Sequence, residues 1–101
     1  MTTLSTHVLD SARGKPAAGL EVTLDGTVTA TTDADGRIGF PGELTPGDHT
    51  LDFATGAWFS AQYRDTFFPT AQVAFQVEQG RSHLHVALLL GPFSFTAYRG
   101  S

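Results

Sequence analysis

Apolar and polar residues alternate along most of the chain, which is the pattern of β-strands that bury one face. The alternation is clearest in residues 20–25 and 73–77, and again in 83–90 before that segment becomes fully apolar. Turn-forming residues separate these segments, and Asp25-Gly26 has the composition of a hairpin turn. We therefore expect about eight short strands: one beginning at Ser5, then 20–25, 27–32, 37–40, 49–53, 73–77, 83–90 and 93–98.

One segment departs from this period of two. Residues 54–65 carry Trp58, Phe59 and Tyr63 on an apolar stripe that suits one or two helical turns. Many short strands separated by turns, with a single short helix, predict an all-β fold: an antiparallel β-sandwich or a barrel.

Length and composition describe one globular domain, residues 1–101. The chain has no cysteine, which excludes disulfides, thiol catalysis and cysteine-ligated metals. Its net charge of −4, without a basic run, argues against nucleic acid or a membrane as a partner. No leader-like segment is visible, and the longest apolar run, residues 86–90, is far shorter than the roughly 20 residues of a membrane helix. We expect a cytoplasmic protein.

The strand at residues 83–90 has two distinct faces. Its even-numbered residues are all aliphatic and define the core face: Leu84, Val86, Leu88 and Leu90. The opposite face begins with histidine and ends in apolar side chains: His83, His85, Ala87 and Leu89. Because so apolar an outer face is typical of an interface, His85 is expected where this sheet meets another subunit. His7 shares a face with Ser5 and Leu9, and it could reach the same place if the two strands face a common cleft.

Histidines are the first candidates for chemistry, because imidazole changes charge near neutral pH. A histidine on a strand is more often solvated or hydrogen-bonded than catalytic, so spacing alone leaves the roles of His7 and His85 open. His83 and His85 lie two apart and could form half of a metal site, but no carboxylate has ligand spacing nearby. Arg37 follows a turn and is by itself compatible with a solvated charge, and His49 is expected at the surface.

The C-terminal segment remains strand-like to its last residue, whereas chain ends are usually polar and frayed. Phe93 and Phe95 are expected in the core, and Tyr98 and Arg99 bring hydrogen-bond donors close to the end. The segment is either an edge strand that ends at a charged residue or a tail that folds into a site.

Several short motifs occur in a fixed order along nearly the whole chain: LSTHVLD at 4–10, GKPA at 14–17, DGR at 35–37, FFP at 67–69, HLHV at 83–86, LLL at 88–90, PF at 92–93 and YRGS at 98–101. This set resembles the 5-hydroxyisourate hydrolases, the transthyretin-related proteins of purine catabolism. Their relative transthyretin, a transport protein, shares the fold but lacks the YRGS tail, the first-strand histidine and the arginine of the DGR turn. The resemblance therefore favours the enzyme.

The resemblance implies a transthyretin-like, two-sheet antiparallel sandwich of about eight strands with a short helix. It implies a homotetramer, a dimer of dimers whose active sites lie at the interface between the dimers. The implied reaction needs no cofactor or metal: water opens the ring of 5-hydroxyisourate, a small purine derivative, to give 2-oxo-4-hydroxy-4-carboxy-5-ureidoimidazoline. The implied catalytic residues are His7, Arg37, His85 and Ser101. The implied substrate-binding residues are His7, Arg37, Tyr98, Arg99 and Gly100.

These residue types suit the implied reaction. A neutral imidazole can take a proton from water and return it to the leaving nitrogen, and an arginine offers forked donors to a developing oxyanion. Which of His7 and His85 is the base stays open. The chain departs from the family pattern at Ala87, Gly91 and Phe95, where Pro, Ser and Tyr are more usual.

Two alternatives belong to other classes. The first is a transthyretin-like carrier that binds small aromatic ligands without turnover, for which His7, Arg37 and His85 together would have little use. The second is a plain structural sandwich, in which the YRGS tail and the histidine-bearing apolar face would be unnecessary.

Overall fold

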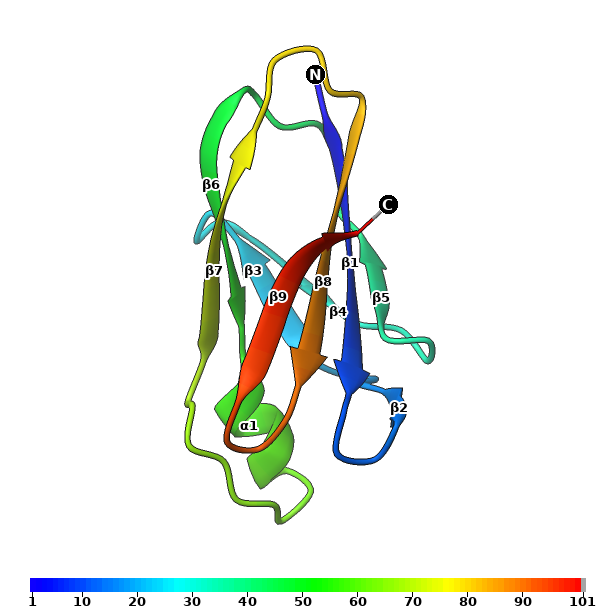
Figure 1. Ribbon diagram of the computed structural model, residues 1–101, viewed down its shortest axis with the longest axis vertical. Coiled ribbons are helices and arrows are strands. Elements are labelled where there is room, and N and C mark those ends of the chain that lie inside the picture. The colour runs from blue at the N-terminus through cyan, green and yellow to red at the C-terminus, as the bar shows by residue number, and fades with distance from the viewer. Residues whose placement is uncertain (101) are drawn as a thin grey trace.

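Two β-sheets face each other across the core, and a short helix lies at one end of the sandwich (Figure 1). The computed structural model describes residues 1–100. In chain order, the elements are β1 (Thr3–Asp10), β2 (Lys15–Pro16), β3 (Glu21–Leu24), β4 (Val28–Thr31), β5 (Arg37–Gly39), β6 (Gly47–Phe53), α1 (Thr55–Ser60), β7 (Ala71–Val77), β8 (His83–Leu90) and β9 (Phe95–Gly100).

The first sheet carries the strands that matter for the site. Its order is β2-β1-β8-β9, and β5 also pairs with β1. β5 pairs with residues 5–7 of β1, and β2 pairs with residues 9–10 of the same strand. The second sheet has the order β4-β3-β6-β7. All pairs are antiparallel except β1 with β8, which are parallel over their full eight residues. This pairing joins segments about 80 residues apart in sequence, so local alternation could not reveal its direction.

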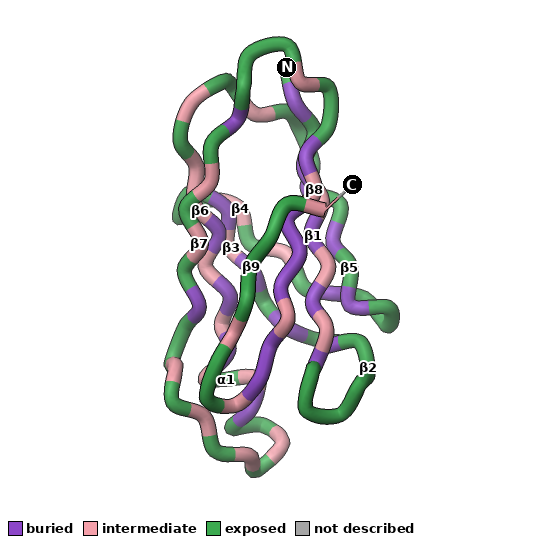
Figure 2. The backbone as a smooth tube through the Cα atoms, in the orientation of Figure 1, coloured by how far each residue is buried: buried purple, intermediate pink, exposed green. Residues whose placement is uncertain are grey.

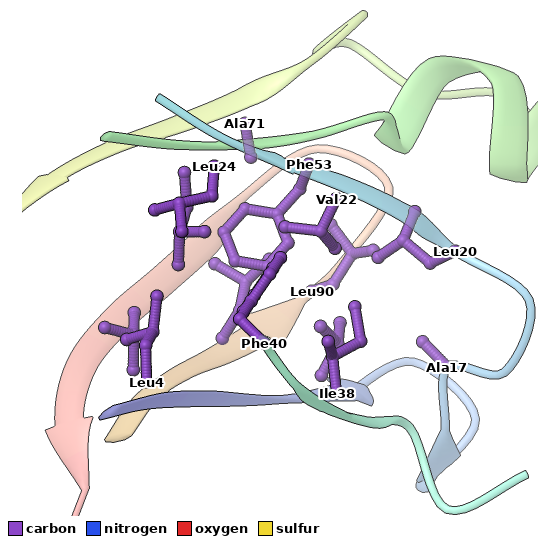
Figure 3. Close-up of a cluster of buried hydrophobic side chains, with 14 of the residues drawn as sticks. Leu4, Ala17, Leu20, Val22, Leu24, Ile38, Phe40, Phe53, Ala71 and Leu90 are labelled. Carbon is purple, nitrogen blue, oxygen red and sulfur yellow. The ribbon is translucent and has the colours of Figure 1, made fainter. Parts of the chain in front are cut away.

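The core lies between the sheets and follows the period of two seen in the sequence. Figure 2 shows buried and more exposed residues alternating along β1, and Figure 3 shows aliphatic and aromatic side chains from both sheets meeting in the core. The predicted core face of β8 is confirmed, since its four even-numbered residues are all buried. The largest fully buried side chains come from both sheets, the helix and the residue before β3: Phe53, Phe59, Leu20, Leu51, Leu88 and Leu90.

Most predicted elements are present, with local differences. The helix falls inside the expected segment, and none of the described residues forms a helix long and apolar enough to span a bilayer. The last strand begins at Phe95 rather than Phe93, because residues 91–94 form the turn that reverses the chain after β8. The prediction that Phe93 belongs to the core is wrong, since it is 67% exposed. Phe95 does pack against the core, with its ring 5.0 Å from that of Phe68.

Candidate active site

Arg37, His7 and Tyr98 lie in one row across the outer face of the first sheet. Arg37 on β5 is opposite His7 on β1, His7 is opposite Ala87 on β8, and Ala87 is opposite Tyr98 on β9. Paired residues of neighbouring strands point to the same face, and alternation with the buried residues directs this row away from the core. Ala87 is 5% exposed, and its side chain, the smallest of the four, lies between the longer side chains of His7 and Tyr98.

The adjacent row contains Ser5, His85 and Gly100. Ser5 on β1 is opposite His85 on β8, which is opposite Gly100 on β9. The Ser5 hydroxyl oxygen lies 2.7 Å from Nδ1 of His85, within hydrogen-bond distance. A Cβ atom built on Gly100 would overlap Cδ2 of the His85 ring, so this position accommodates the imidazole because glycine has no side chain. The tail motif and the second histidine therefore meet directly.

A tight turn places Arg37 at the start of β5. The Asp33 carboxylate accepts hydrogen bonds from the backbone N–H groups of Asp35 and Arg37, at 2.9 and 3.0 Å. Gly36 has a φ of +75°, and a Cβ there would lie 2.5 Å from the carbonyl oxygen of Val8. Only glycine suits both this backbone conformation and this close approach to β1. The Asp-Gly-Arg motif thus forms the turn that places Arg37 beside His7.

Burial and neighbouring charges favour a neutral His85. Burial lowers the pKa of His85, and the Arg37 guanidinium lowers it further, followed by the imidazoles of His7 and His83. An imidazole that is neutral near pH 7 has a lone pair available to accept a proton from water. The electrostatics of the face therefore suit His85 to general-base chemistry.

The tail residues divide between the two faces of the sheet. Tyr98 and Gly100 share the outer face with the histidines, and Tyr98 is 51% exposed. Arg99 is opposite the inward-facing Val86, and together with Tyr98 it lines a hollow between β9 and β7. Ser101, predicted as a catalytic residue, lies outside the described residues. The structure thus brings His7, Arg37, His85, Tyr98 and Gly100 onto one face and directs Arg99 to the other.

Sequence reasoning gave Ser5 and His83 no role at the site, yet both belong to its hydrogen-bond network. Ser5 Oγ lies 2.9 Å from Nε2 of His83, and Thr3 Oγ1 lies 2.6 Å from Nδ1 of the same ring. Ser5 lies two residues before His7 on the same strand, so the sequence predicts that both side chains point to the same face. The hydrogen-bond partners of Ser5, however, depend on the parallel register of β1 and β8. His83 and His85 are thus both bonded to Ser5, and no cluster of three or more metal-ligating side chains occurs within residues 1–100.

His49, which the sequence predicted at the surface, is half-buried. Its side chain is only 12% exposed on the second sheet, with Nδ1 2.6 Å from an Asp25 carboxylate oxygen and Nε2 2.8 Å from the Thr45 carbonyl oxygen. The ring also stacks on Phe75 with centroids 6.0 Å apart. Because both ring nitrogens have partners within the protein, His49 has a structural role away from the outer-face site.

The fold and the outer-face site define a transthyretin-like domain. The model of the HIUase/transthyretin family matches residues 4–100. A 5-hydroxyisourate hydrolase from Salmonella dublin is 41% identical over 109 residues, which cover 97% of this chain and 80% of that protein. The chain belongs to the HIUase/transthyretin family.

Solved structures from both branches of the family are similar to this chain. The structure of Klebsiella pneumoniae 5-hydroxyisourate hydrolase superposes with a TM-score of 0.91 at 39% identity, covering all of both chains. Sea bream transthyretin in complex with thyroxine superposes with a TM-score of 0.83 at 30% identity, covering 96% of this chain and 93% of that one. The fold alone is therefore compatible with an enzyme or a carrier, and the site has to distinguish them.

Proposed function

We propose that this chain is a 5-hydroxyisourate hydrolase. The observation that supports this most strongly is the placement of His7, Arg37 and His85 on one outer face, with the glycine of the YRGS tail against the His85 ring. Relatives named 5-hydroxyisourate hydrolase match nearly the whole chain, which supports the same substrate.

The residues of this face perform the steps of a cyclic-amide hydrolysis. An imidazole takes a proton from water while the water oxygen bonds to the ring carbonyl carbon. The Arg37 guanidinium donates hydrogen bonds to the oxyanion that forms there. The C–N bond of the ring amide then breaks, and the imidazolium returns its proton to the leaving nitrogen. His7 and His85 form the water-activating pair, and the Tyr98 ring and hydroxyl contact the planar substrate.

Three further tail residues have proposed roles. Ser101 acts with the catalytic histidines, as the resemblance of the YRGS motif implies. Gly100 allows the tail to approach the site, and Arg99 contributes to substrate binding by holding the tail in place. Its position on the inner face favours this indirect action over a direct contact.

The site is completed by assembly into a homotetramer, a dimer of dimers with sites between the dimers. The site residues lie on the outer face of a single chain, so a substrate bound there would have solvent on its other side. A second copy laid on this face would exclude that water and cover Ala87 and Leu89. Sedimentation tests the assembly: we expect about 43 kDa, four times the 10.7 kDa chain, and a fully active monomer would contradict it. The cytoplasmic location remains a prediction.

Turnover of fresh substrate distinguishes the enzyme from the carrier. We would generate 5-hydroxyisourate in situ from urate with urate oxidase and follow its ultraviolet decay with and without the protein. We expect decay to accelerate in proportion to protein concentration. Binding of thyroxine with an unchanged decay rate would instead support the carrier, and neither effect would support a structural sandwich.

A further inference from the structure

We propose that Ser5 and His83 are positioning residues that fix the tautomer of His85, leaving its Nε2 as the bare nitrogen that accepts the proton from water. The kinetic consequence rests on the proposed function, whereas the tautomer can be observed without substrate. The proposal therefore selects His85 over His7 as the base.

Four side chains on the outer face form a continuous hydrogen-bonded chain. The parallel register of β1 and β8 sets Thr3 opposite His83 and Ser5 opposite His85. Thr3 Oγ1 lies 2.6 Å from Nδ1 of His83, Nε2 of that ring lies 2.9 Å from Ser5 Oγ, and Ser5 Oγ lies 2.7 Å from Nδ1 of His85. Because all three distances are within hydrogen-bond range, the protons along the chain are coupled to one another.

We assign the direction of this hydrogen-bonded chain at its distal end, at Thr3. The Thr3 hydroxyl also donates to the carbonyl oxygen of Ser82, at 3.4 Å, and a carbonyl oxygen can only accept. A hydroxyl has one proton, so a Thr3 hydroxyl that directs its proton to this carbonyl has none left for His83 and accepts from Nδ1–H of that ring, and this is the polarity of the proposal. His83 in its neutral form then has a bare Nε2, which accepts the proton of the Ser5 hydroxyl.

Ser5 links the protonation of His83 to that of His85. With its proton donated to His83, the Ser5 oxygen accepts a hydrogen bond from Nδ1–H of His85. Neutral His85 then has a bare Nε2, and the structure gives this atom no hydrogen-bond partner within residues 1–100. The opposite polarity, in which Ser5 donates to His85, would put the proton on Nε2 and leave no base there. The direction of this hydrogen-bonded chain thus decides whether His85 can accept a proton.

Nitrogen NMR of the imidazoles tests the tautomer directly. We would record long-range ¹H–¹⁵N correlations of the ¹⁵N-labelled protein at pH 8, with the His85 signals assigned from their loss in His85→Gln. We expect wild-type His85 as the Nδ1–H tautomer and Ser5→Ala shifted toward the Nε2–H tautomer, which free histidine favours. Ser5→Thr should keep the wild-type pattern because it retains the hydroxyl. Thr29→Val is the matched control, since it removes a hydrogen-bonded hydroxyl from the second sheet.

Kinetics give the second measurement. We expect Ser5→Ala to lower kcat about tenfold with KM within about twofold, because Ser5 acts through His85 and not on the substrate. His83→Phe should have an effect in the same direction. A wild-type His85 in the Nε2–H tautomer, or a Ser5→Ala protein that folds with an unchanged tautomer and kcat, would overturn the proposal. Wild-type protein that does not hydrolyse 5-hydroxyisourate would refute the proposed function, while the NMR result would still decide the positioning role.

Discussion

Gly100 lies against the imidazole ring of His85, so close that a Cβ atom on Gly100 would overlap Cδ2 of the ring. The two residues face each other across the antiparallel pairing of β8 and β9. The steric contact explains in physical terms why a glycine stands in the tail at this position: any side chain would displace the imidazole.

Gly100→Ala should therefore impair catalysis more than stability. We expect kcat to fall at least about tenfold, since small displacements of a catalytic group are costly, while the melting temperature changes by only a few degrees. The matched control is Gly39→Ala, which makes the same change in the same row of residues, opposite Ser5, where a Cβ meets no atom within 4 Å. Equal activity of the two variants would show that the contact with His85 has no catalytic importance.

Arg37 should not be replaceable by lysine. Arg37→Lys keeps a positive charge but loses the forked donors that bind an oxyanion, so we expect kcat to fall on the order of 10- to 100-fold. Arg37→Ala should lose on the order of 10²–10³-fold. Arg13→Lys, a change of the same kind on the loop after β1, should be near wild type. Steady-state assays of folded protein decide this, and full activity of Arg37→Lys would leave only a role for charge.

The pH profile should reflect the environment of His85. Because burial and the Arg37 guanidinium lower the pKa of His85, its neutral form persists to more acidic pH than the usual value of about 6.5. We expect kcat/KM to be flat above that value and to fall only as pH drops through the lowered pKa. Arg37→Gln removes one cause of the lowered His85 pKa. The residual activity of this variant should therefore begin to fall at a higher pH than the activity of the wild type. An identical limb in both proteins would contradict this assignment.

The Asp25–His49 pair should stabilise the second sheet within a defined pH window. The hydrogen bond to Asp25 raises the pKa of His49, so its stabilisation is complete below about pH 6.5 and is lost as pH rises through the folded-state value. Burial alone would raise the pKa of Asp25, but hydrogen bonds from His49 and Thr50 lower it overall. Its stabilisation is therefore present above about pH 4 and is lost as pH falls through the lowered value.

Urea unfolding of His49→Gln at two pH values measures this contribution. We expect the variant to lose about 1 kcal/mol of unfolding free energy at pH 5.5, and less at pH 9, because the stabilisation is lost as pH rises through the raised pKa of His49. Asp52→Asn is a suitable control, because it removes a carboxylate from the same strand without touching the pair. A loss that is the same at both pH values would mean that the charged hydrogen bond contributes nothing.

The sequence alone was sufficient for those parts of the fold that depend on local patterns. Alternation identified the core face of β8, and the Asp-Gly turns appear where expected, with Gly26 at a φ of +69° and Gly36 at +75°. The two-residue β2 was not predicted, because so short a strand has no period of its own. Phe93 was misplaced because an apolar residue in a turn looks the same, in sequence, as the first residue of a strand.

The site could be predicted only as far as single residues and the family resemblance allowed. His7 and His85 could each be assigned to a face, but their common sheet follows from a pairing between distant segments. The partners of Ser5 and His49 depend on the same kind of long-range register, so the network around His85 and the Asp25 pair were missed. Arg99 was grouped with the site by its motif, whereas strand alternation directs it to the other face from Tyr98 and Gly100.

The most direct measurement is the initial rate of 5-hydroxyisourate decay with wild-type protein and with His85→Ala, at equal concentration and with matched circular dichroism spectra. If the outer-face histidine activates water, the wild type should accelerate decay strongly and His85→Ala should lose about 10²–10⁴-fold of that acceleration. A wild-type rate equal to that of buffer, or a folded His85→Ala protein as fast as the wild type, would contradict hydrolysis by this site.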